Sequence, residues 1–222
     1  MPDWTKSMQR TYEYYLVDPL SWCDKSRITC VKSSTIERDS SEATTGHATL
    51  EVTESLNECY IRIYMVVIQN GVTEKFPLAT VLAQTPGNDF DGKIASMSID
   101  AYMPLVELKE TLPPYGFTIM KNANIMENAC KNIQEHMRAP LIVTESNKTL
   151  VENFISNTDD TWLTFSSDLI AKADFSFSTD EMGTVTFSPK RELEAMQPVV
   201  TFGDDEHSIL QPSISTEYDL YG

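Results

Sequence analysis

The run CYIRIYMVVI at Cys59–Ile68, dense in β-branched and aromatic side chains, constrains the fold more than any other feature of the sequence. Such a run predicts a strand that is covered on both of its faces. Asn70-Gly71 follows directly and is the strongest short-range signal for a two-residue β-hairpin, and Thr73–Phe76 fits the start of the partner strand. We therefore expect a sheet in which this strand has an antiparallel neighbour.

Two further segments alternate between apolar and polar residues, which is the pattern of a strand with one buried and one wet face. They are Ala48–Val52 and Ser96–Ala101. Pro86–Asp89 and Asp91-Gly92 predict a turn before the second of these strands. The pattern over residues 1–112 favours an antiparallel meander or barrel.

The period changes after Pro113-Pro114. Gly116–Met120 fits a short strand. Between Asn124 and Met137 the apolar residues fall at helical spacing, and either Asn122 or Asn124 can cap this helix.

A second helix is predicted to begin near Asp159-Asp160, because acidic residues suit the positive end of a helix. Phe175–Ser188 reads as a hairpin with its turn at Asp180–Gly183, whereas Leu150–Ile155 fits either a strand or a short helix. We interpret residues 113–190 as a small α+β module with both helices packed on a small sheet. The buried face of the second helix would carry Trp162, Phe165, Leu169 and Ala173.

The remaining residues, 191–222, are acidic and contain no Lys or Arg after Arg191. Val199–Phe202 is apolar enough for a strand. We expect an extended C-terminal segment that returns toward the strands of residues 1–112.

The charge balance restricts the possible partners. With 17 basic and 33 acidic side chains, the formal net charge is −16. This excess argues against general nucleic-acid binding, which needs Lys and Arg, and against adsorption to anionic membranes. It is explained either by solubility or by an acidic surface or lumen along which DNA passes without sticking. No apolar run is long enough for a membrane-spanning helix, and the N-terminus lacks the apolar core of a secretory signal.

The sequence contains no recognisable catalytic constellation. It has no Gly-rich phosphate loop, no G-x-S-x-G elbow and no H-E-x-x-H motif. Cys130 and His136 would lie on poorly matched faces of one helix. Asp204–His207 could bind a cation, but adjacent acidic residues on a loop are usually solvated. We therefore predict no enzyme activity, no cofactor and no metal.

The cysteines indicate a protein made in a reducing compartment. None of the four belongs to a C-x-x-C pair, and the histidines are isolated, so no structural zinc site is expected. We interpret the cysteines as reduced and mostly buried, although Cys23 with Cys30 could close a short loop. They are Cys23, Cys30, Cys59 and Cys130.

The succession of segments resembles the tail hub family of bacteriophages, also described as baseplate hub proteins of contractile tails. Four groups of motifs carry the resemblance over nearly the whole chain. They are Glu37–Asp39 with GHATLEV at Gly46–Val52, YIRIY at Tyr60–Tyr64 and PLATVLAQTP at Pro77–Pro86; PPYGFTI at Pro113–Ile119; DTWLTFSSDL at Asp160–Leu169 with DEMGTVTFSP at Asp180–Pro189; and QPVVTFGDDEHSIL at Gln197–Leu210 with EYDLYG at Glu217–Gly222.

The resemblance implies an α+β, mainly β fold: an antiparallel, tube-like β-barrel with an inserted small α+β module. It also implies a structural virion protein, made in the host cytoplasm, at the tail tip. Such hubs form a threefold ring that joins the tail tube to the tip complex and leaves a channel for DNA ejection. The implied partners are two further copies, the tail tube or distal tail protein, tip, fibre or tape-measure proteins, and passing DNA without specific binding.

The resemblance departs from the family at Gly222, where hubs of this kind continue into a second barrel. We expect that barrel to come from a longer polypeptide or another chain. The expected interface residues are Thr49, Glu51, Tyr60, Arg62, Tyr64, Val199, Phe202, Tyr218 and Tyr221. The alternatives are a distal tail ring protein of the same assembly and, from a different class, a tail-associated cell-wall-processing or receptor-binding module.

Overall fold

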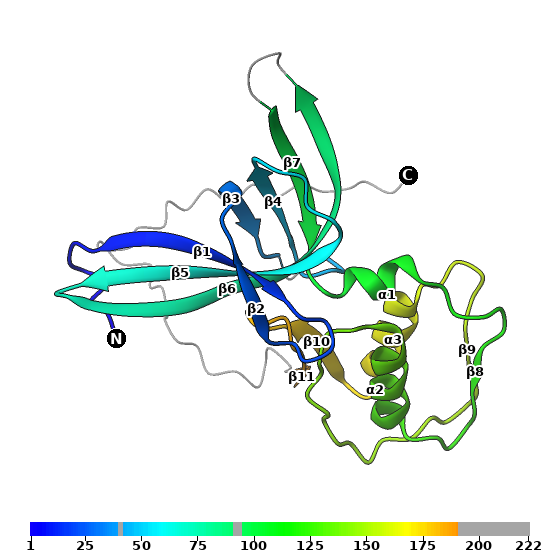
Figure 1. Ribbon diagram of the computed structural model, residues 1–222. Coiled ribbons are helices and arrows are strands. Elements are labelled where there is room, and N and C mark those ends of the chain that lie inside the picture. Colours follow the sequence, from blue (N-terminus) through cyan, green and yellow to red (C-terminus); the bar gives the residue numbers. More distant parts are fainter. Residues whose placement is uncertain (40–41, 91–94, 191–222) are drawn as a thin grey trace, which may run out of the picture. The chain divides into compact units, whose positions relative to one another are not determined.

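A computed structural model describes residues 1–39, 42–90 and 95–190, with backbone alone for 85–90 and 95–96. Residues Met1–Pro189 form one compact unit. Its strands are β1 (Gln9–Val17), β2 (Asp24–Ile28), β3 (Val31–Glu37), β4 (His47–Val52), β5 (Cys59–Gln69), β6 (Val72–Phe90), β7 (Ala95–Tyr102), β8 (Thr118–Ile119), β9 (Phe154–Ile155), β10 (Phe175–Thr179) and β11 (Val185–Pro189) (Figure 1). Its helices are α1 (Val106–Glu110), α2 (Ile125–His136) and α3 (Trp162–Ala171). The predicted α+β, mainly β class is confirmed.

Seven strands form one antiparallel sheet in the order β2-β1-β5-β6-β7-β4-β3. The long strand β6 is shared by two hairpins, because Val72–Ala83 pairs with β5 and a later part, ending at Phe90, pairs with β7. In the turn between β5 and β6, Asn70 and Gly71 have φ angles of 52° and 76°. Two positive φ angles are the signature of the type I′ turn that the Asn-Gly pair predicts.

The central strand β5 is buried on both of its faces, as its composition predicts. Ile61 and Ile63 pack into an apolar core with side chains of the neighbouring strands. On the alternate positions, Tyr60, Arg62 and Tyr64 are also buried. Because successive side chains of a strand point to opposite faces, the second set lies on the other side of the sheet.

The predicted barrel is not closed within the described residues. The edge strands β2 and β3 are separated by only Thr29 and Cys30, and the Tyr14 hydroxyl on β1 lies 2.9 Å from the Ser34 hydroxyl on β3. The two ends of the sheet therefore approach each other, yet no ladder pairs β2 with β3 in the described ranges. Most side chains of β2 are exposed, so little apolar area is available to drive that pairing.

The Pro86–Asp89 part of the predicted turn is wrong, because β6 continues through these residues to Phe90, and the Asp91-Gly92 part lies outside the described residues. The ladder with β5 ends at Ala83, so Pro86 has no partner on that side, and the register shifts between Ala83 and Pro86. An unpaired edge with a bulge is where a strand tolerates a residue that has no N–H.

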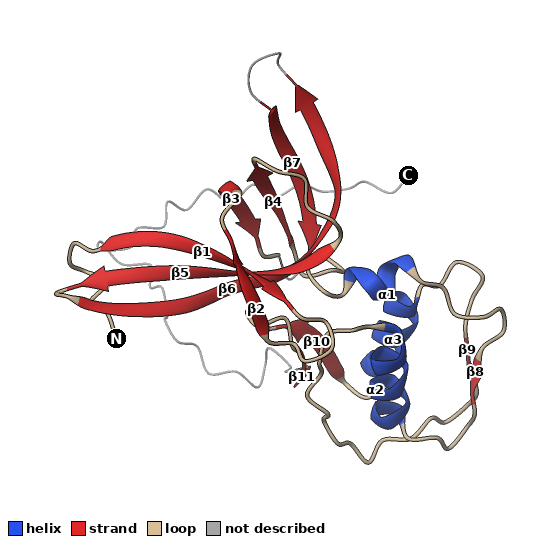
Figure 2. Ribbon diagram, in the orientation of Figure 1, coloured by secondary structure: helices blue, strands red, loops and turns tan. Residues whose placement is uncertain are grey.

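The helices α1–α3 lie together at one end of the unit (Figure 2). The predicted buried face of α3 is confirmed, and it shares a core with Ile133 of α2 and Leu108 of α1. The predicted caps differ in outcome. Asn124 caps α2 as expected, whereas α3 begins after Thr161, whose side chain forms a capping box with Thr164. Thr161 rather than the aspartates caps α3 because its hydroxyl reaches the N–H of the third helical residue.

Three details of the helical region differ from the predictions or were left open by them. Residues 106–110 were expected to be part of the strand region but form α1, a helix too short to show a period. The two longer helices pack chiefly on each other, and the confirmed hairpin β10–β11 lies against α3. The ambiguous Leu150–Ile155 segment contains β9, which pairs with β8.

Candidate interaction surfaces and the joint between sheet and module

Arg62 on β5 holds a buried positive charge, with its side chain only 2% exposed. Its Nε donates to Thr80 Oγ1 at 2.9 Å and its Nη1 to Asp24 Oδ1 at 2.8 Å. Its Nη2 donates to the carbonyl oxygens of Trp22 and Met182, at 3.2 and 3.1 Å. Each guanidinium nitrogen thus has an acceptor, which a charge in this environment requires.

The turn of the β10–β11 hairpin packs directly against these groups. Trp22 Nε1 donates to the Met182 carbonyl at 2.8 Å, and Thr80 Oγ1 donates to the Glu181 carbonyl at 3.2 Å. A Cβ atom on Gly183 would lie 2.9 Å from Thr80 Cβ and 3.1 Å from Trp22 Cζ2. Only glycine fits this approach without displacing its neighbours.

Residues at the end of β3 and in the loop before β4 hold the same hairpin from another side. Arg38 Nη1 donates to Glu181 Oε1 at 2.7 Å, and its Nη2 donates to the Thr179 carbonyl. The hydroxyls of Thr45 and Thr179 are 2.9 Å apart. We call this set the sheet–module joint: Trp22, Asp24, Arg38, Thr45, Arg62, Thr80 and Thr179–Gly183.

The residues predicted to form an interface fall into three groups. Glu51 is exposed on β4, and Thr49 on the same strand is half-buried. The β5 residues face the interior of this chain: Tyr60 is 2% exposed, Arg62 1% and Tyr64 8%. The others, Val199, Phe202, Tyr218 and Tyr221, lie outside the described residues, as does Asp204–His207.

The strands β1, β5 and β6 form a three-stranded arm (Figure 1). The arm extends beyond the part of the sheet where β2 pairs with β1 and β7 pairs with β6. Both of its outer edges, Gln9–Glu13 of β1 and Val72–Val81 of β6, have no strand partner within the described residues. Pro77 lies on the β6 edge, where a missing N–H does no harm. Such edges favour pairing with another strand.

Charged and aromatic groups cover one face of this arm. Lys75 Nζ lies 3.8 and 3.9 Å from the ring centroids of Tyr15 and Tyr64, and 3.3 Å from Glu13 Oε2. The Tyr64 hydroxyl donates to Asp24 Oδ2 at 2.7 Å, and burial together with this carboxylate raises the pKa of Tyr64. These contacts connect the arm to the joint.

A groove of about 600 Å³ lies where the start of β5 meets α1 and the end of α2. Arg138 at its wall donates from Nε to Glu107 Oε1 at 2.5 Å and from Nη2 to Glu58 Oε1 at 3.0 Å. Its guanidinium carbon lies 5.1 Å from the centroid of the Tyr60 ring. Burial, with Glu107 nearby, raises the pKa of Tyr60 far above its ordinary value. Arg138, whose side chain is 45% exposed, therefore partly neutralises Glu107 and Glu58 of this groove.

The cysteines form no disulfide in the described chain, so Cys23 and Cys30 do not close a loop. The cysteines were predicted to be mostly buried: Cys130 is buried, Cys30 and Cys59 are half-buried, and Cys23 is exposed. Burial raises the pKa of the Cys59 thiol to about 11, with smaller effects of Cys30 and Glu58. A thiol with such a pKa is a poor nucleophile at neutral pH.

His136 is likewise occupied by structural contacts. Its Nδ1 lies 2.9 Å from the Asn132 carbonyl, and its ring stacks on Trp162 with centroids 4.0 Å apart. In the part of the chain that the structure describes, no three acidic, Cys or His side chains gather as metal ligands. No helix in that part is both long enough and apolar enough to cross a membrane.

The fold of this chain is similar to the folds of two tail proteins, one of them from a prophage, and of a chain in a PdpA–VgrG complex. A tail protein from Neisseria meningitidis matches 80% of this chain and 51% of its own, with a TM-score of 0.60 and 10% identity. The 43 kDa tail protein of prophage MuSo2 from Shewanella oneidensis matches 81% and 56%, with a TM-score of 0.54 and 13% identity. A Francisella PdpA–VgrG complex matches 90% of this chain and 31% of its own, with a TM-score of 0.51 and 11% identity.

This chain spans about half the length of the two tail proteins. No protein-family model and no curated protein matches the sequence. At these identities the likeness rests on the fold alone, and it agrees with the family that the motifs resemble.

Sequence reasoning missed the joint. Met182 and Gly183 belong to the predicted hairpin turn, but Trp22 lies about 160 positions earlier and in no motif, so no local pattern connects it with the turn. The one available signal was Arg62, a lone charge inside an apolar run. A charge in that position requires buried partners, but the sequence does not say which residues supply them.

Proposed function

We propose that this chain is a structural component of a phage-type tail tip: the hub that joins the tail tube to the tip complex and leaves a channel for DNA. The fold match to two tail proteins over 80% and 81% of the chain carries this proposal. Its function is assembly rather than catalysis, and its place is the virion tail. The unpaired strand edges of the arm support it, because such edges need a partner strand.

We also propose that the sheet closes into a barrel in the assembled tail. Strands from residues 191–222 or from another chain complete the sheet, and a second barrel converts a threefold ring into the six positions that a sixfold tube requires. Glu51 and other acidic residues would then keep the channel free of tightly bound DNA.

Electron microscopy of intact tail tips tests the proposal, with this chain located by a fused tag. Three copies at the end of the tube are expected. Six copies would instead identify a distal tail ring, and absence from the tail would refute the assignment. Incubation of the purified chain with cell-wall fragments should release no products, whereas cleavage would favour the cell-wall-processing alternative.

A further inference from the structure

The helical module is attached to the sheet in two regions of different chemistry. The first region is apolar and lies at α1, which follows the end of β7. Val106 of α1 is buried in a small cluster with Tyr60 and Leu82 of the sheet, and the Arg138 guanidinium lies over the Tyr60 ring. Leu108, also on α1, is buried in the module core. The helix α1 therefore belongs to both parts. The second region is the sheet–module joint, which is polar.

At the joint the β10–β11 hairpin offers mainly carbonyl oxygens of its main chain. The acceptors are the carbonyls of Thr179, Glu181 and Met182, and the donors are four side chains of the sheet region: Trp22, Arg38, Arg62 and Thr80. Glu181 is exposed and Met182 is half-buried. Carbonyls in such a turn can accept hydrogen bonds from water instead. Opening of the joint would therefore leave these acceptors satisfied.

Arg62 would also keep its partners if the hairpin moved away. Of its four hydrogen bonds, only the one to the Met182 carbonyl crosses to the module. The others go to Thr80, Asp24 and the Trp22 carbonyl, all in the sheet region. Each guanidinium nitrogen thus retains an acceptor, so the buried charge stays paired. The charge at the joint does not prevent its opening.

Two residues of the joint have strained backbones. Trp22 and Thr45 have φ angles of 56° and 64°, which are unfavourable for bulky and β-branched residues. The other non-glycine residues with positive φ in the described ranges are of types that tolerate it: Asn70, Asn122 and Asp174. Both strained residues contact the hairpin, through the indole of Trp22 and the hydroxyl of Thr45. Such strain persists where surrounding contacts offset it. Release of the hairpin would therefore let both loops relax.

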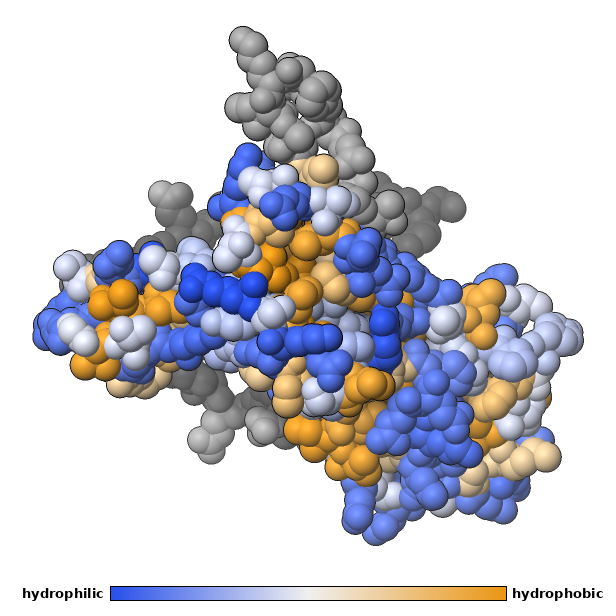
Figure 3. All heavy atoms as spheres, viewed as in Figure 1, coloured by the Kyte–Doolittle hydropathy of each residue, from blue (hydrophilic) through white to orange (hydrophobic). Residues whose placement is uncertain are grey.

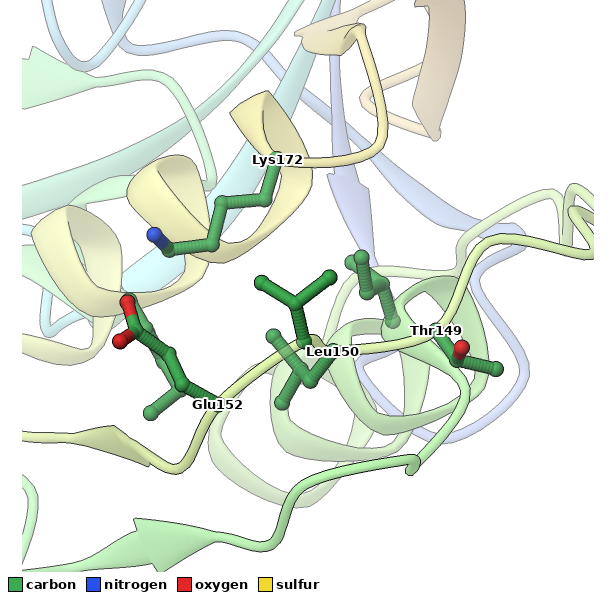
Figure 4. A pocket seen from close by; sticks show the side chains of 7 residues that line it. Thr149, Leu150, Glu152 and Lys172 are labelled. Carbon is green, nitrogen blue, oxygen red and sulfur yellow. The ribbon is translucent and has the colours of Figure 1, made fainter.

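The module keeps its own packing without the joint. The hairpin belongs to the module core through Val185, which is fully buried there, and Phe177 and Phe187 pack against that core. Module residues alone line the pocket in Figure 4, among them Leu150 and Lys172. On the sheet side, hydrophilic side chains cover β2, part of which belongs to the joint (Figure 3). Water can therefore reach the boundary between the two parts.

We propose that the turn of the β10–β11 hairpin is a releasable latch between the sheet and the module. On release the module pivots on α1, the two large apolar cores stay folded, and the loops that carry Trp22 and Thr45 relax. The hydrogen bonds of the joint hold the docked form against this strain. The latch is a property of the chain itself and does not rest on the proposed function.

A crosslink across the joint tests the latch in the purified full chain. The indole proton of Trp22 reports release, because its acceptor lies on the hairpin. Thr45→Cys combined with Thr179→Cys places two sulfurs where the hydroxyls are 2.9 Å apart, so oxidised glutathione can bond the hairpin to the sheet. We expect oxidation to slow exchange of the Trp22 indole proton, followed by NMR, at least about tenfold, and dithiothreitol to restore it. The single variant Thr45→Cys should not respond. An exchange rate that the crosslink leaves unchanged would overturn the proposal.

A second variant tests release without a crosslink. Thr179→Val removes one hydroxyl contact across the joint and keeps the side-chain shape, so exchange of the Trp22 indole proton should rise at least about threefold. Thr186→Val is the matched control, because the Thr186 hydroxyl lies 3.3 Å from that of Ser178 within the same hairpin. Backbone amides of β5 should exchange much more slowly than the indole proton in all of these chains, since release leaves the sheet folded. Equal effects of the two variants, or indole exchange as slow as that of β5, would refute the latch.

Discussion

Gly183 and Gly71 have nearly the same backbone conformation, with φ angles of 77° and 76°, but different surroundings. A side chain on Gly183 would collide with Thr80 and Trp22, whereas nothing lies within 4 Å of a Cβ atom on Gly71. Comparing substitutions at these two glycines therefore separates the free-energy cost of the left-handed backbone conformation from the cost of steric overlap.

We expect Gly183→Ala to lower the free energy of unfolding by about 3 kcal/mol or more, because backbone strain and overpacking add. Gly71→Ala should cost about 1 kcal/mol, from strain alone. Urea unfolding of both variants measures the difference. Equal losses would show that the hairpin turn is not tightly packed on the sheet.

The half-buried thiol of Cys59 makes a pH-dependent contribution to stability. Its pKa is about 11 in the folded chain against an ordinary value of 9.0. Between these values the unfolded chain releases the proton first, so the free energy of unfolding falls as pH rises from 9 to 11. Below pH 9 both states hold the proton and the effect vanishes.

Between pH 8.5 and 11, the free energy of unfolding should fall by about 1 kcal/mol less in Cys59→Ala than in the wild-type chain. This figure is reduced because the thiol is partly exposed to solvent. Urea unfolding at pH 8.5 and 11 checks the prediction. Cys23→Ala is the control because Cys23 is exposed. A wild-type pH dependence in Cys59→Ala would mean that the thiol is solvated.

At the scale of elements, α3 depends on its capping box. Thr164 N donates to Thr161 Oγ1 at 3.2 Å, and Thr161 N donates to Thr164 Oγ1 at 2.9 Å. Because α3 carries Trp162, Phe165 and Leu169 into the module core, fraying of its first turn would loosen that core.

Thr161→Ala should lower the free energy of unfolding by about 1 kcal/mol, since it leaves an N–H at the helix start without its acceptor. Thr158→Ala, an exposed change in the preceding turn, should have little effect. Thermal unfolding followed by circular dichroism compares the two variants. A similar loss in both would assign no stabilising role to the cap.

At the scale of the whole unit, two large apolar cores, one in the sheet and one in the module, are linked by the sheet–module joint. Arg62 is central to the joint because it contacts Asp24, Thr80 and the hairpin turn. A buried pair of this kind adds little over apolar packing, but loss of one partner leaves the other charge unpaired.

We expect Arg62→Met to cost about 3–5 kcal/mol and to separate the unfolding of the two cores. Arg27→Met should cost less than about 1 kcal/mol, because Arg27 is 55% exposed and pairs with Glu13 at 3.2 Å. Backbone hydrogen exchange measured across a urea series follows the module core through the amides of α3 and the sheet core through the amides of β5. Coincident transitions in Arg62→Met would show that the joint does not couple the cores.

Local patterns predicted the elements whose signals lie within one segment. The β5 run, the Asn70-Gly71 hairpin, the buried face of α3 and the hairpin of β10 and β11 could all be found this way. The helix α1 could not, because five residues are too few to show a period. The continuation of β6 through Pro86 could not either, because it depends on which edge of the strand is unpaired.

The sequence by itself determined that β5 would be buried and that the chain would combine a sheet with a small helical module, because periodicity records how each segment meets solvent. Only the tertiary structure decided what Arg62 does. Arg62 was expected at an interface between proteins, which stays a prediction; within this chain it donates to the carbonyl oxygen of Met182, 120 positions later. Periodicity cannot encode such a contact, since desolvation requires a partner for the charge without specifying which distant carbonyl provides it.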